Sequence, residues 1–152
     1  MRILVTVGTF KFDGLIKTVD NLALNNFHSF TCQIGSGEYK PKNCNWFDYS
    51  SEFDSFVQDA DLVITHAGAG TVYGLLEKNK NIIVIPNIYR VDHHQRELSK
   101  YVGDNNFALT CEDLNSLEYV IEQSGEFFSN ECRPYSKENF SKYGDIINYL
   151  KN

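Results

Sequence analysis

Short apolar runs alternate along the chain with longer stretches in which apolar residues recur every three or four positions. A strand covered on both faces needs apolar or β-branched residues at every position, and the runs at residues 3–7, 62–65 and 82–85 meet this condition. We therefore predict buried strands there. Three further strands are predicted from runs of similar composition, at residues 30–34, 46–49 and 107–110.

The stretches between the strands have the apolar spacing of helices that bury one face. Asp13 is a candidate N-cap for the first helix, which ends at residues 25–26, and Ser51 with Asp54 resembles a capping box for the second. Residues 124–136 carry no clear signal for either element. The other predicted helices cover residues 72–78, 93–102, 113–123 and 137–150.

This alternation predicts an α/β fold. Strands separated by helices form right-handed crossovers, which gives a Rossmann-like, mainly parallel sheet with helices on both faces. The length of 152 residues predicts a single domain over residues 1–152. Such sheets bind ligands beyond the carboxyl ends of their strands. Polar segments follow three of the strands, at residues 8–9, 66–71 and 87–95, and we expect them to converge on one crevice.

Residues 61–71 read as a strand, a tight glycine turn and the start of a helix. Gly68 and Gly70 allow a ligand to approach the backbone closely, because they have no Cβ. The amides of Ala69, Gly70 and Thr71 lie at the expected helix N-terminus, where unpaired N–H groups and the helix dipole favour an anion. A diphosphate suits this turn; the alternative is a structural turn in which the glycines serve only chain reversal.

The charge balance narrows the possible partners. A formal net charge of −6 and an isoelectric point near 5.1 argue against a nucleic-acid binder, because that class relies on a basic surface. No apolar run approaches the roughly 20 residues that span a bilayer, and the first residues lack the apolar core and cleavage site of a signal peptide. We therefore expect a cytoplasmic protein.

The four cysteines are widely spaced and form no CxxC pair of the kind found in zinc sites or thioredoxin-like motifs. We interpret all four as reduced thiols. Cys32 and Cys111 fall in strand-like runs and are predicted to be buried, whereas Cys44 and Cys132 fall in loop-like segments.

Four blocks of sequence together resemble a known family. They are residues 5–9 with Phe12 and Asp13, residues 60–71, residues 83–86 and residues 92–95, in this order. These blocks are similar to the C-terminal domain of the family-28 glycosyltransferases. More narrowly, they resemble the small soluble subunits of two-part enzymes, including those of dolichol-pathway N-acetylglucosamine transfer and of bacterial capsule or exopolysaccharide synthesis. The resemblance extends from Met1 to about Phe107.

The resemblance implies the C-terminal half of a GT-B glycosyltransferase of the inverting type. Such a half would bind a UDP-sugar of the UDP-GlcNAc, UDP-Gal or UDP-GlcA class. A membrane-associated subunit would bring the lipid-linked saccharide acceptor and recruit the chain to the cytoplasmic face of the membrane. No metal or other cofactor is implied, because helix-terminal amides can stabilise the leaving UDP.

Two other interpretations remain open at this point. One is a non-catalytic partner subunit that keeps the fold and assists a transferase. The other is a freestanding dinucleotide-binding domain, which is disfavoured because the glycine turn follows the fourth strand and the first strand lacks GxGxxG.

The family match assigns roles to individual residues. Gly68, Ala69, Gly70 and Thr71 match the phosphate turn, with Gly8 and Thr9 in the facing loop. His66 is the candidate catalytic residue, since it could donate to phosphate; the alternative is a histidine that caps the strand end. The sugar-binding candidates are His94 and Gln95, which could otherwise form a solvated first helical turn.

Ribose recognition is assigned to Glu77, because Gly74 stands where the family often places an acidic residue on the helix after the turn. We also expect a partner subunit to dock at the rim of the crevice, on four apolar residues of probable loops whose alternative is packing onto the core of the domain. These are Phe10, Phe12, Ile88 and Tyr89.

Overall fold

The computed structural model describes residues 1–87 and 94–136. Its strands are β1 (Arg2–Thr6), β2 (Ser29–Gln33), β3 (Asn45–Phe47), β4 (Leu62–His66), β5 (Ile82–Ile85) and β6 (Leu109–Thr110). Its helices are α1 (Asp13–Ala23), α2 (Phe53–Asp59), α3 (Ala69–Glu77), α4 (His94–Asp104) and α5 (Leu117–Asn130), with a 3₁₀ turn, η1 (Leu114–Ser116), before α5. All six predicted strands are present.

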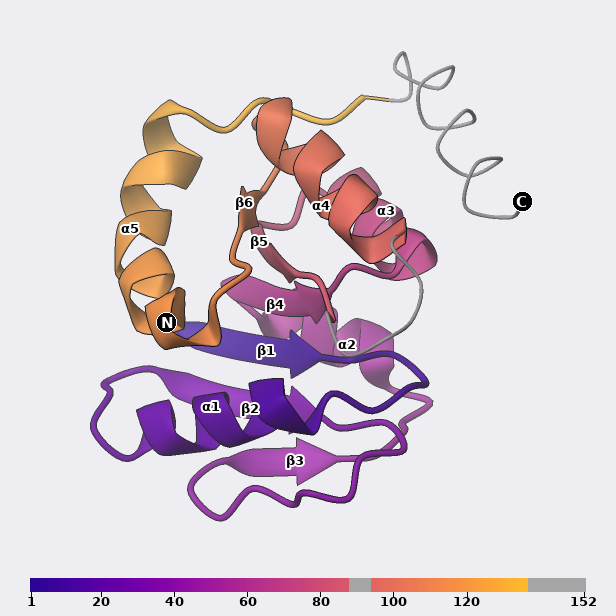
Figure 1. The fold of residues 1–152 in the computed structure, drawn as a ribbon, viewed down its shortest axis with the longest axis vertical. Helices are drawn as coiled ribbons and strands as arrows, with labels where there is room; N and C mark the ends of the chain where they lie inside the picture. Colours follow the sequence, from indigo (N-terminus) through magenta and orange to yellow (C-terminus); the bar gives the residue numbers. More distant parts are fainter. Residues whose placement is uncertain (88–93, 137–152) are drawn as a thin grey trace.

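The six strands form one parallel sheet in the order β3-β2-β1-β4-β5-β6 (Figure 1). In the centre, Ile3 of β1 lies opposite Phe30 of β2 on one side and Leu62 of β4 on the other. The strand order reverses between β1 and β4, and ligands of such sheets bind outside the carboxyl ends of the strands at this point. The predicted Rossmann-like parallel sheet is confirmed.

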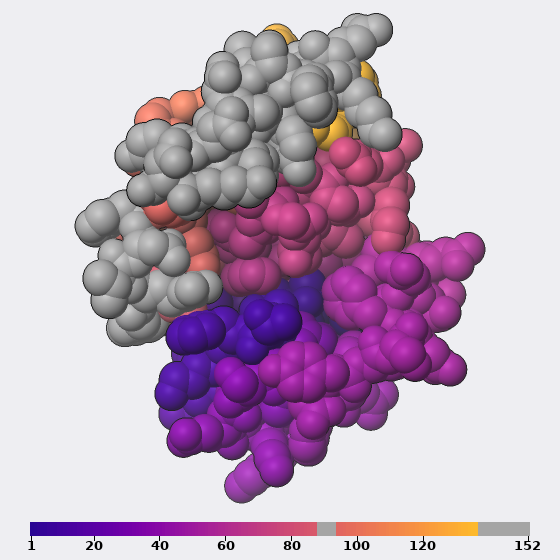
Figure 2. Space-filling model, turned by 90° about the vertical axis from the view of Figure 1, so that its right-hand side faces the viewer, coloured from indigo at the N-terminus to yellow at the C-terminus, as the bar shows by residue number. Residues whose placement is uncertain are grey.

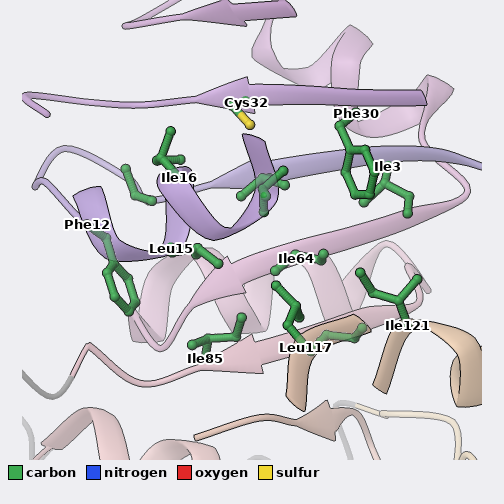
Figure 3. Packing of buried hydrophobic residues seen from close by; sticks show 14 of the residues in the cluster. Ile3, Phe12, Leu15, Ile16, Phe30, Cys32, Ile64, Ile85, Leu117 and Ile121 are labelled. Carbon is green, nitrogen blue, oxygen red and sulfur yellow. The ribbon is translucent and has the colours of Figure 1, made fainter. Parts of the chain in front are cut away.

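Two apolar layers hold the helices on opposite faces of the sheet. Successive residues of a strand point to opposite faces, so Ile3 and Val5 pack against α1 and α5, whereas Leu4 packs on the side of α2, α3 and α4. Figure 3 shows Leu15 of α1 and Leu117 of α5 among the buried residues of the first layer. Helices on both faces, as predicted, leave the carboxyl edge of the sheet as the place for a site.

The predicted helix caps differ from those observed. Asp13 is the first residue of α1, and the N-cap is Phe12, whose carbonyl accepts hydrogen bonds from the amides of Leu15 and Ile16. The Phe12 ring is buried in the core, and the Asp13 carboxylate accepts from the Glu38 amide at 3.4 Å instead of capping the helix. Helix α2 has Glu52 as its N-cap without a side-chain cap, so the capping box of Ser51 and Asp54 is wrong.

Helix α5 is longer than the sequence pattern predicted. It continues to Asn130 through a segment in which no element was predicted. Ser124 and Gly125 weaken the helical signal there, yet the buried Ser124 hydroxyl donates to the Ile121 carbonyl at 2.6 Å within the helix. The helix predicted at residues 137–150 lies outside the described residues.

The long connection between β2 and β3 is anchored on α1 by the buried carboxylate of Asp20. This group accepts hydrogen bonds from the Tyr39 hydroxyl at 2.6 Å and from the amides of Lys42 and Asn43 at 3.0 and 2.7 Å. Burial raises the pKa of Asp20, but these hydrogen bonds outweigh it and leave the pKa below its ordinary value. The connection is therefore held in one place although it has no regular structure.

All four cysteines are free thiols. Cys32 and Cys111 are buried, as the sequence predicted, and Cys44 and Cys132 are half-buried. The sulfur atoms of Cys32 and Cys44 lie 3.7 Å apart, where the end of the long connection packs beside β2.

Candidate functional site

The carboxyl ends of β1 and β4 bring His66 into contact with two glycines. A Cβ added at Gly8 would lie 2.7 Å from His66 Cε1, and one added at Gly68 would collide with His66 Nε2. The imidazole thus occupies the space that a side chain at either position would need. The absence of a Cβ at these two positions is explained by the protein's own histidine, a reason that the sequence pattern did not reveal.

Figure 2 views the carboxyl edge of the sheet, where the surface is hollowed between the indigo residues of the β1–α1 loop and the pink residues of α3. His66, at the end of β4, is half-buried. The structure therefore places His66 at the carboxyl edge of the sheet, as predicted. Its catalytic role stays a prediction.

The N-terminus of α3 lies beside the histidine. The first helical hydrogen bond runs from the Val72 amide to the Gly68 carbonyl at 2.9 Å, so the amides of Ala69, Gly70 and Thr71 have no acceptor within the helix. A Cβ at Gly70 would meet no protein atom within 4 Å. These three amides can therefore receive an anion, and the predicted order of strand, turn and helix is correct.

The β1–α1 loop, which carries Gly8 and Thr9, is fixed from behind. Gly8 has a φ of 70°; its amide donates to Gln33 Oε1 at 3.1 Å and its carbonyl accepts from Gln33 Nε2 at 2.8 Å. The exposed Thr9 accepts a hydrogen bond from the Tyr49 hydroxyl through its carbonyl, at 3.2 Å. Because the Gly8 amide is engaged, the predicted diphosphate contact of this loop depends on Thr9.

On the other side of the crevice, α4 is joined to the end of β5. The side chain of Gln95 is buried, and its Oε1 accepts from the Asn87 amide at 2.8 Å. The Asn87 side chain in turn donates to the Lys11 carbonyl at 3.2 Å. A solvated first turn is therefore wrong for Gln95, whereas His94, the first residue of α4, is half-buried. Sugar binding by both stays a prediction.

The two positions considered for ribose lie at different distances along α3. At 1.5 Å per residue, Gly74 lies roughly 7.5 Å and the exposed Glu77 roughly 12 Å beyond Ala69 along the helix axis. A Cβ at Gly74 would meet no atom within 4 Å. The side chain of Glu77 must therefore reach back about one turn to serve the ribose role assigned to it.

Of the four residues expected to dock a partner, Phe10 and Phe12 differ in their exposure to solvent. Phe10 is 47% exposed, but Phe12 is only 4% exposed and belongs to the core beside α1, so its place in a docking surface is wrong. Ile88 and Tyr89 lie outside the described residues. Tyr49, which sequence reasoning missed, is 55% exposed and is hydrogen-bonded to the same loop as Phe10.

Sequence reasoning also missed a buried polar row at the carboxyl ends of three adjacent strands. Gln33 of β2, Thr6 of β1 and Thr65 of β4 lie side by side in register, and each is at most 4% exposed. The available signal was a polar residue closing each of three apolar strands.

Within residues 1–87 and 94–136, no cluster of His, Cys, Asp and Glu side chains could hold a metal ion. The Asp-x-Asp triplet of Asp59 to Asp61 lies at the amino end of β4, where Asp61 accepts from the Arg2 amide at 2.7 Å. This is the opposite edge of the sheet from His66. No helix in the same part of the chain is long and apolar enough to cross a bilayer.

The sequence of this chain matches the Glycosyltransferase family 28 C-terminal domain over residues 2–148. The chain belongs to this family. Among curated relatives, the UDP-N-acetylglucosamine transferase subunit ALG13 of Mus musculus is 34% identical over 129 residues, which cover 75% of this chain and 11% of that protein. The human subunit is 32% identical over 72% of this chain and 11% of its own length. The chain thus spans about a tenth of these two relatives.

Solved structures show the same fold. A solution structure of ALG13 superposes with a TM-score of 0.61 at 20% identity, covering 91% of this chain and 94% of that one. The crystal structure of Acinetobacter baumannii MurG gives a TM-score of 0.67 at 19% identity, covering 97% of this chain and 52% of MurG. The predicted family and the equivalence to one half of a GT-B transferase are confirmed. Membership of this family argues against the alternative of a freestanding dinucleotide-binding domain.

Proposed function

We propose that this family-28 chain is the donor-binding catalytic subunit of an inverting UDP-sugar glycosyltransferase. The observation that carries the proposal is the open N-terminus of α3, with three amides that have no helical acceptor, beside the half-buried His66. These groups meet where the strand order of the sheet reverses. The chain would act at the cytoplasmic face of a membrane, to which its partner recruits it.

The chemistry follows from where charge develops. An acceptor hydroxyl attacks the anomeric carbon, the bond from that carbon to the UDP oxygen breaks, and the hydroxyl proton passes to a base on the acceptor side. Negative charge grows on the diphosphate during this step. Preorganised N–H donors at Ala69, Gly70 and Thr71 stabilise that charge, and His66 can donate a further hydrogen bond to a phosphate oxygen.

Donor sugar hydroxyls are assigned to α4. Gln95 uses its oxygen to hold Asn87, and its amide nitrogen supplies donors for a sugar hydroxyl. His94 is the second candidate. The curated relatives are named for UDP-N-acetylglucosamine, so this is the first donor to test, followed by UDP-Gal and UDP-GlcA.

A separate subunit must bind the acceptor in this proposal. The chain corresponds to 52% of the MurG chain, and the curated relatives carry the word subunit in their names. Phe10 and Tyr49 expose apolar rings beside the crevice. A membrane-associated partner that carries a lipid-linked saccharide would cover this rim.

One observation favours a second candidate, a non-catalytic partner subunit. Position 74 carries no acidic side chain, although the space around its Cβ is open. A chain that had lost donor binding would tolerate this change.

Calorimetric titration of the purified chain tests the two candidates. UDP, UDP-GlcNAc, UDP-Gal and UDP-GlcA are added in turn, in buffer with EDTA and again with magnesium. Saturable binding of UDP and of one UDP-sugar, equal in both buffers, is expected. An absence of UDP binding in both buffers would refute the donor-binding proposal and favour the non-catalytic subunit.

A further inference from the structure

The side chain of Gln33, at the end of β2, is bonded to the ends of both neighbouring strands. Its Oε1 accepts from Thr6 Oγ1 at 2.6 Å and from the amides of Val7 and Gly8 at 3.1 Å each. Its Nε2 donates to the carbonyls of Gly8 and Asp48, both at 2.8 Å. One side chain, 4% exposed, thus joins the loops that follow β1 and β3.

The partners fix the orientation of this amide. The oxygen faces two backbone amides and the nitrogen faces two backbone carbonyls, so a flipped amide would lose these four bonds and keep only the one to the Thr6 hydroxyl, which can also accept. Gly8 leaves the strand with a φ of 70°, and Gln33 satisfies both its N–H and its C=O. The side chain therefore extends the pairing of β2 with β1 to Gly8, beyond the Val7 amide that also donates to the Gln33 carbonyl at 3.3 Å.

The same contacts reach the candidate site. Gly8 is the residue against which the His66 ring lies. At the other end, Asp48 precedes Tyr49, whose hydroxyl donates to Thr9. Gln33 therefore sets the distance between the β1–α1 loop and the residues after β3. Through Gly8 it also sets the position of the His66 ring.

We propose that Gln33 is a positioning residue of the donor site, which holds Gly8 and Asp48 so that His66 and the N-terminus of α3 face the donor in a fixed geometry. This inference rests on the proposed function. Gln33 acts through Gly8 and makes no contact with the donor itself.

The test compares Gln33→Met with Ser124→Ala. Methionine keeps the length and burial of the side chain but makes none of the five hydrogen bonds. Ser124→Ala removes a buried hydrogen bond on α5, away from the site. For the wild type and both variants, we would measure amide exchange at Val7 and Gly8, the melting temperature and the Kd for UDP.

The folded Gln33→Met variant should exchange the Gly8 amide faster and bind UDP about tenfold more weakly, while Ser124→Ala keeps the wild-type Kd. If Gln33→Met does not fold, Gln33→Glu replaces it. Its carboxylate keeps the accepting oxygen but turns a second oxygen towards the carbonyls of Gly8 and Asp48, so the same rise in Kd is expected.

A folded Gln33 variant with the wild-type Kd would overturn the positioning role, whatever its melting temperature. A wild-type chain that binds no UDP in the same titration would defeat the proposed function, and the donor site that Gln33 positions would fall with it. The two failures are therefore distinguished by the wild-type titration alone.

Discussion

Gly8 and Gly68 both lie against the His66 ring, but different constraints exclude a side chain at each position. Gly68 has a φ of −80°, which any residue adopts, so only the His66 ring forbids a side chain there. Gly8 has the same ring contact and in addition a φ of 70°, in the left-handed region. Gly70 differs from both, because its Cβ position is open to solvent.

This difference predicts an interaction between substitutions. Gly68→Ala should destabilise the wild type by about 1–3 kcal/mol, because the added methyl group collides with the imidazole. In a His66→Ala background the same substitution should be nearly neutral. The measurement is the free energy of unfolding in urea for the four members of the double-mutant cycle.

Gly8→Ala is the matched control for this cycle. Its backbone strain does not depend on the ring, so it should remain destabilising in the His66→Ala background. Equal costs of Gly68→Ala in the two backgrounds would contradict the packing explanation.

Gly70 provides the cleanest test of anion binding at α3. A valine at this position meets no protein atom at its Cβ but places its methyl groups where a phosphate would approach the amides. Gly70→Val should fold and lose UDP binding by at least about tenfold.

Gly125→Val in α5 is the control, since it also adds a side chain at a helical glycine with open space around it. Isothermal titration of both variants with UDP gives the comparison. Wild-type affinity in Gly70→Val would place the diphosphate elsewhere.

Strands and helices could be predicted where the local pattern of apolar residues was clear. β4 and β5 are buried at nearly every position, so their apolar runs identified them directly. The N-cap of α1 was missed because the Asp13 carboxylate accepts from the amide of Glu38, 25 residues away, instead of capping the helix. Gln33 was missed for the same reason, since its bonding partners Thr6 and Gly8 lie 27 and 25 residues away.

Helix α4 allows the two roles of Gln95 to be separated. Gln95→Glu keeps the oxygen that accepts from Asn87 and removes the amide nitrogen. If that nitrogen reads a sugar hydroxyl, affinity for the UDP-sugar should fall by the ~0.5–1.5 kcal/mol of a neutral hydrogen bond, while affinity for UDP is unchanged.

Gln95→Ala removes both groups and should weaken both ligands, because the segment after β5 loses its anchor. Titration of each variant with UDP and with the UDP-sugar distinguishes these outcomes. Equal losses for the two ligands in Gln95→Glu would exclude sugar reading by the nitrogen.

The contact between α1 and the β2–β3 connection predicts a pH dependence. The pKa of Asp20 is lowered in the folded protein, because its hydrogen bonds outweigh the opposing effect of burial. A lowered folded pKa gives stability that is present above the unfolded value near 3.8 and is lost as pH falls through the folded value. Asp20→Asn should therefore be less stable than wild type at pH 7, by about 1–3 kcal/mol.

The difference between the two proteins should shrink below about pH 4, as Asp20 becomes protonated in the wild type. Urea unfolding at a series of pH values between 7 and 3 measures it. A constant difference over this range would show that the carboxylate charge is unimportant and that packing alone matters.

The described residues form a single sheet, which corresponds in fold to one half of a GT-B protein. We expect the purified chain alone to transfer little sugar to a lipid-linked acceptor and to become active when co-purified with a membrane-associated partner. The measurement is transfer from the UDP-sugar that binds most tightly. Robust turnover by the chain alone would contradict the two-component interpretation.

Phe10→Ser tests where the partner of the proposed function docks. Phe10 is 47% exposed, so the variant should keep UDP affinity but lose co-purification with the partner. Leu24→Ser is the control, because Leu24 is 62% exposed at the far end of α1.

The strand order also determines when each strand can pair during synthesis of the chain. β1 leaves the ribosome first, but Ile3 pairs with Leu62 of β4, which is translated 59 residues later. At about 5–20 residues per second, roughly 3–12 s pass before β4 can pair with this edge of β1. Until then the backbone N–H and C=O groups along that edge lack their β4 partners, and His66, which contacts Gly8, has not yet been synthesised. Slower translation between residues 7 and 62 should therefore lengthen the time for which these groups are unpaired.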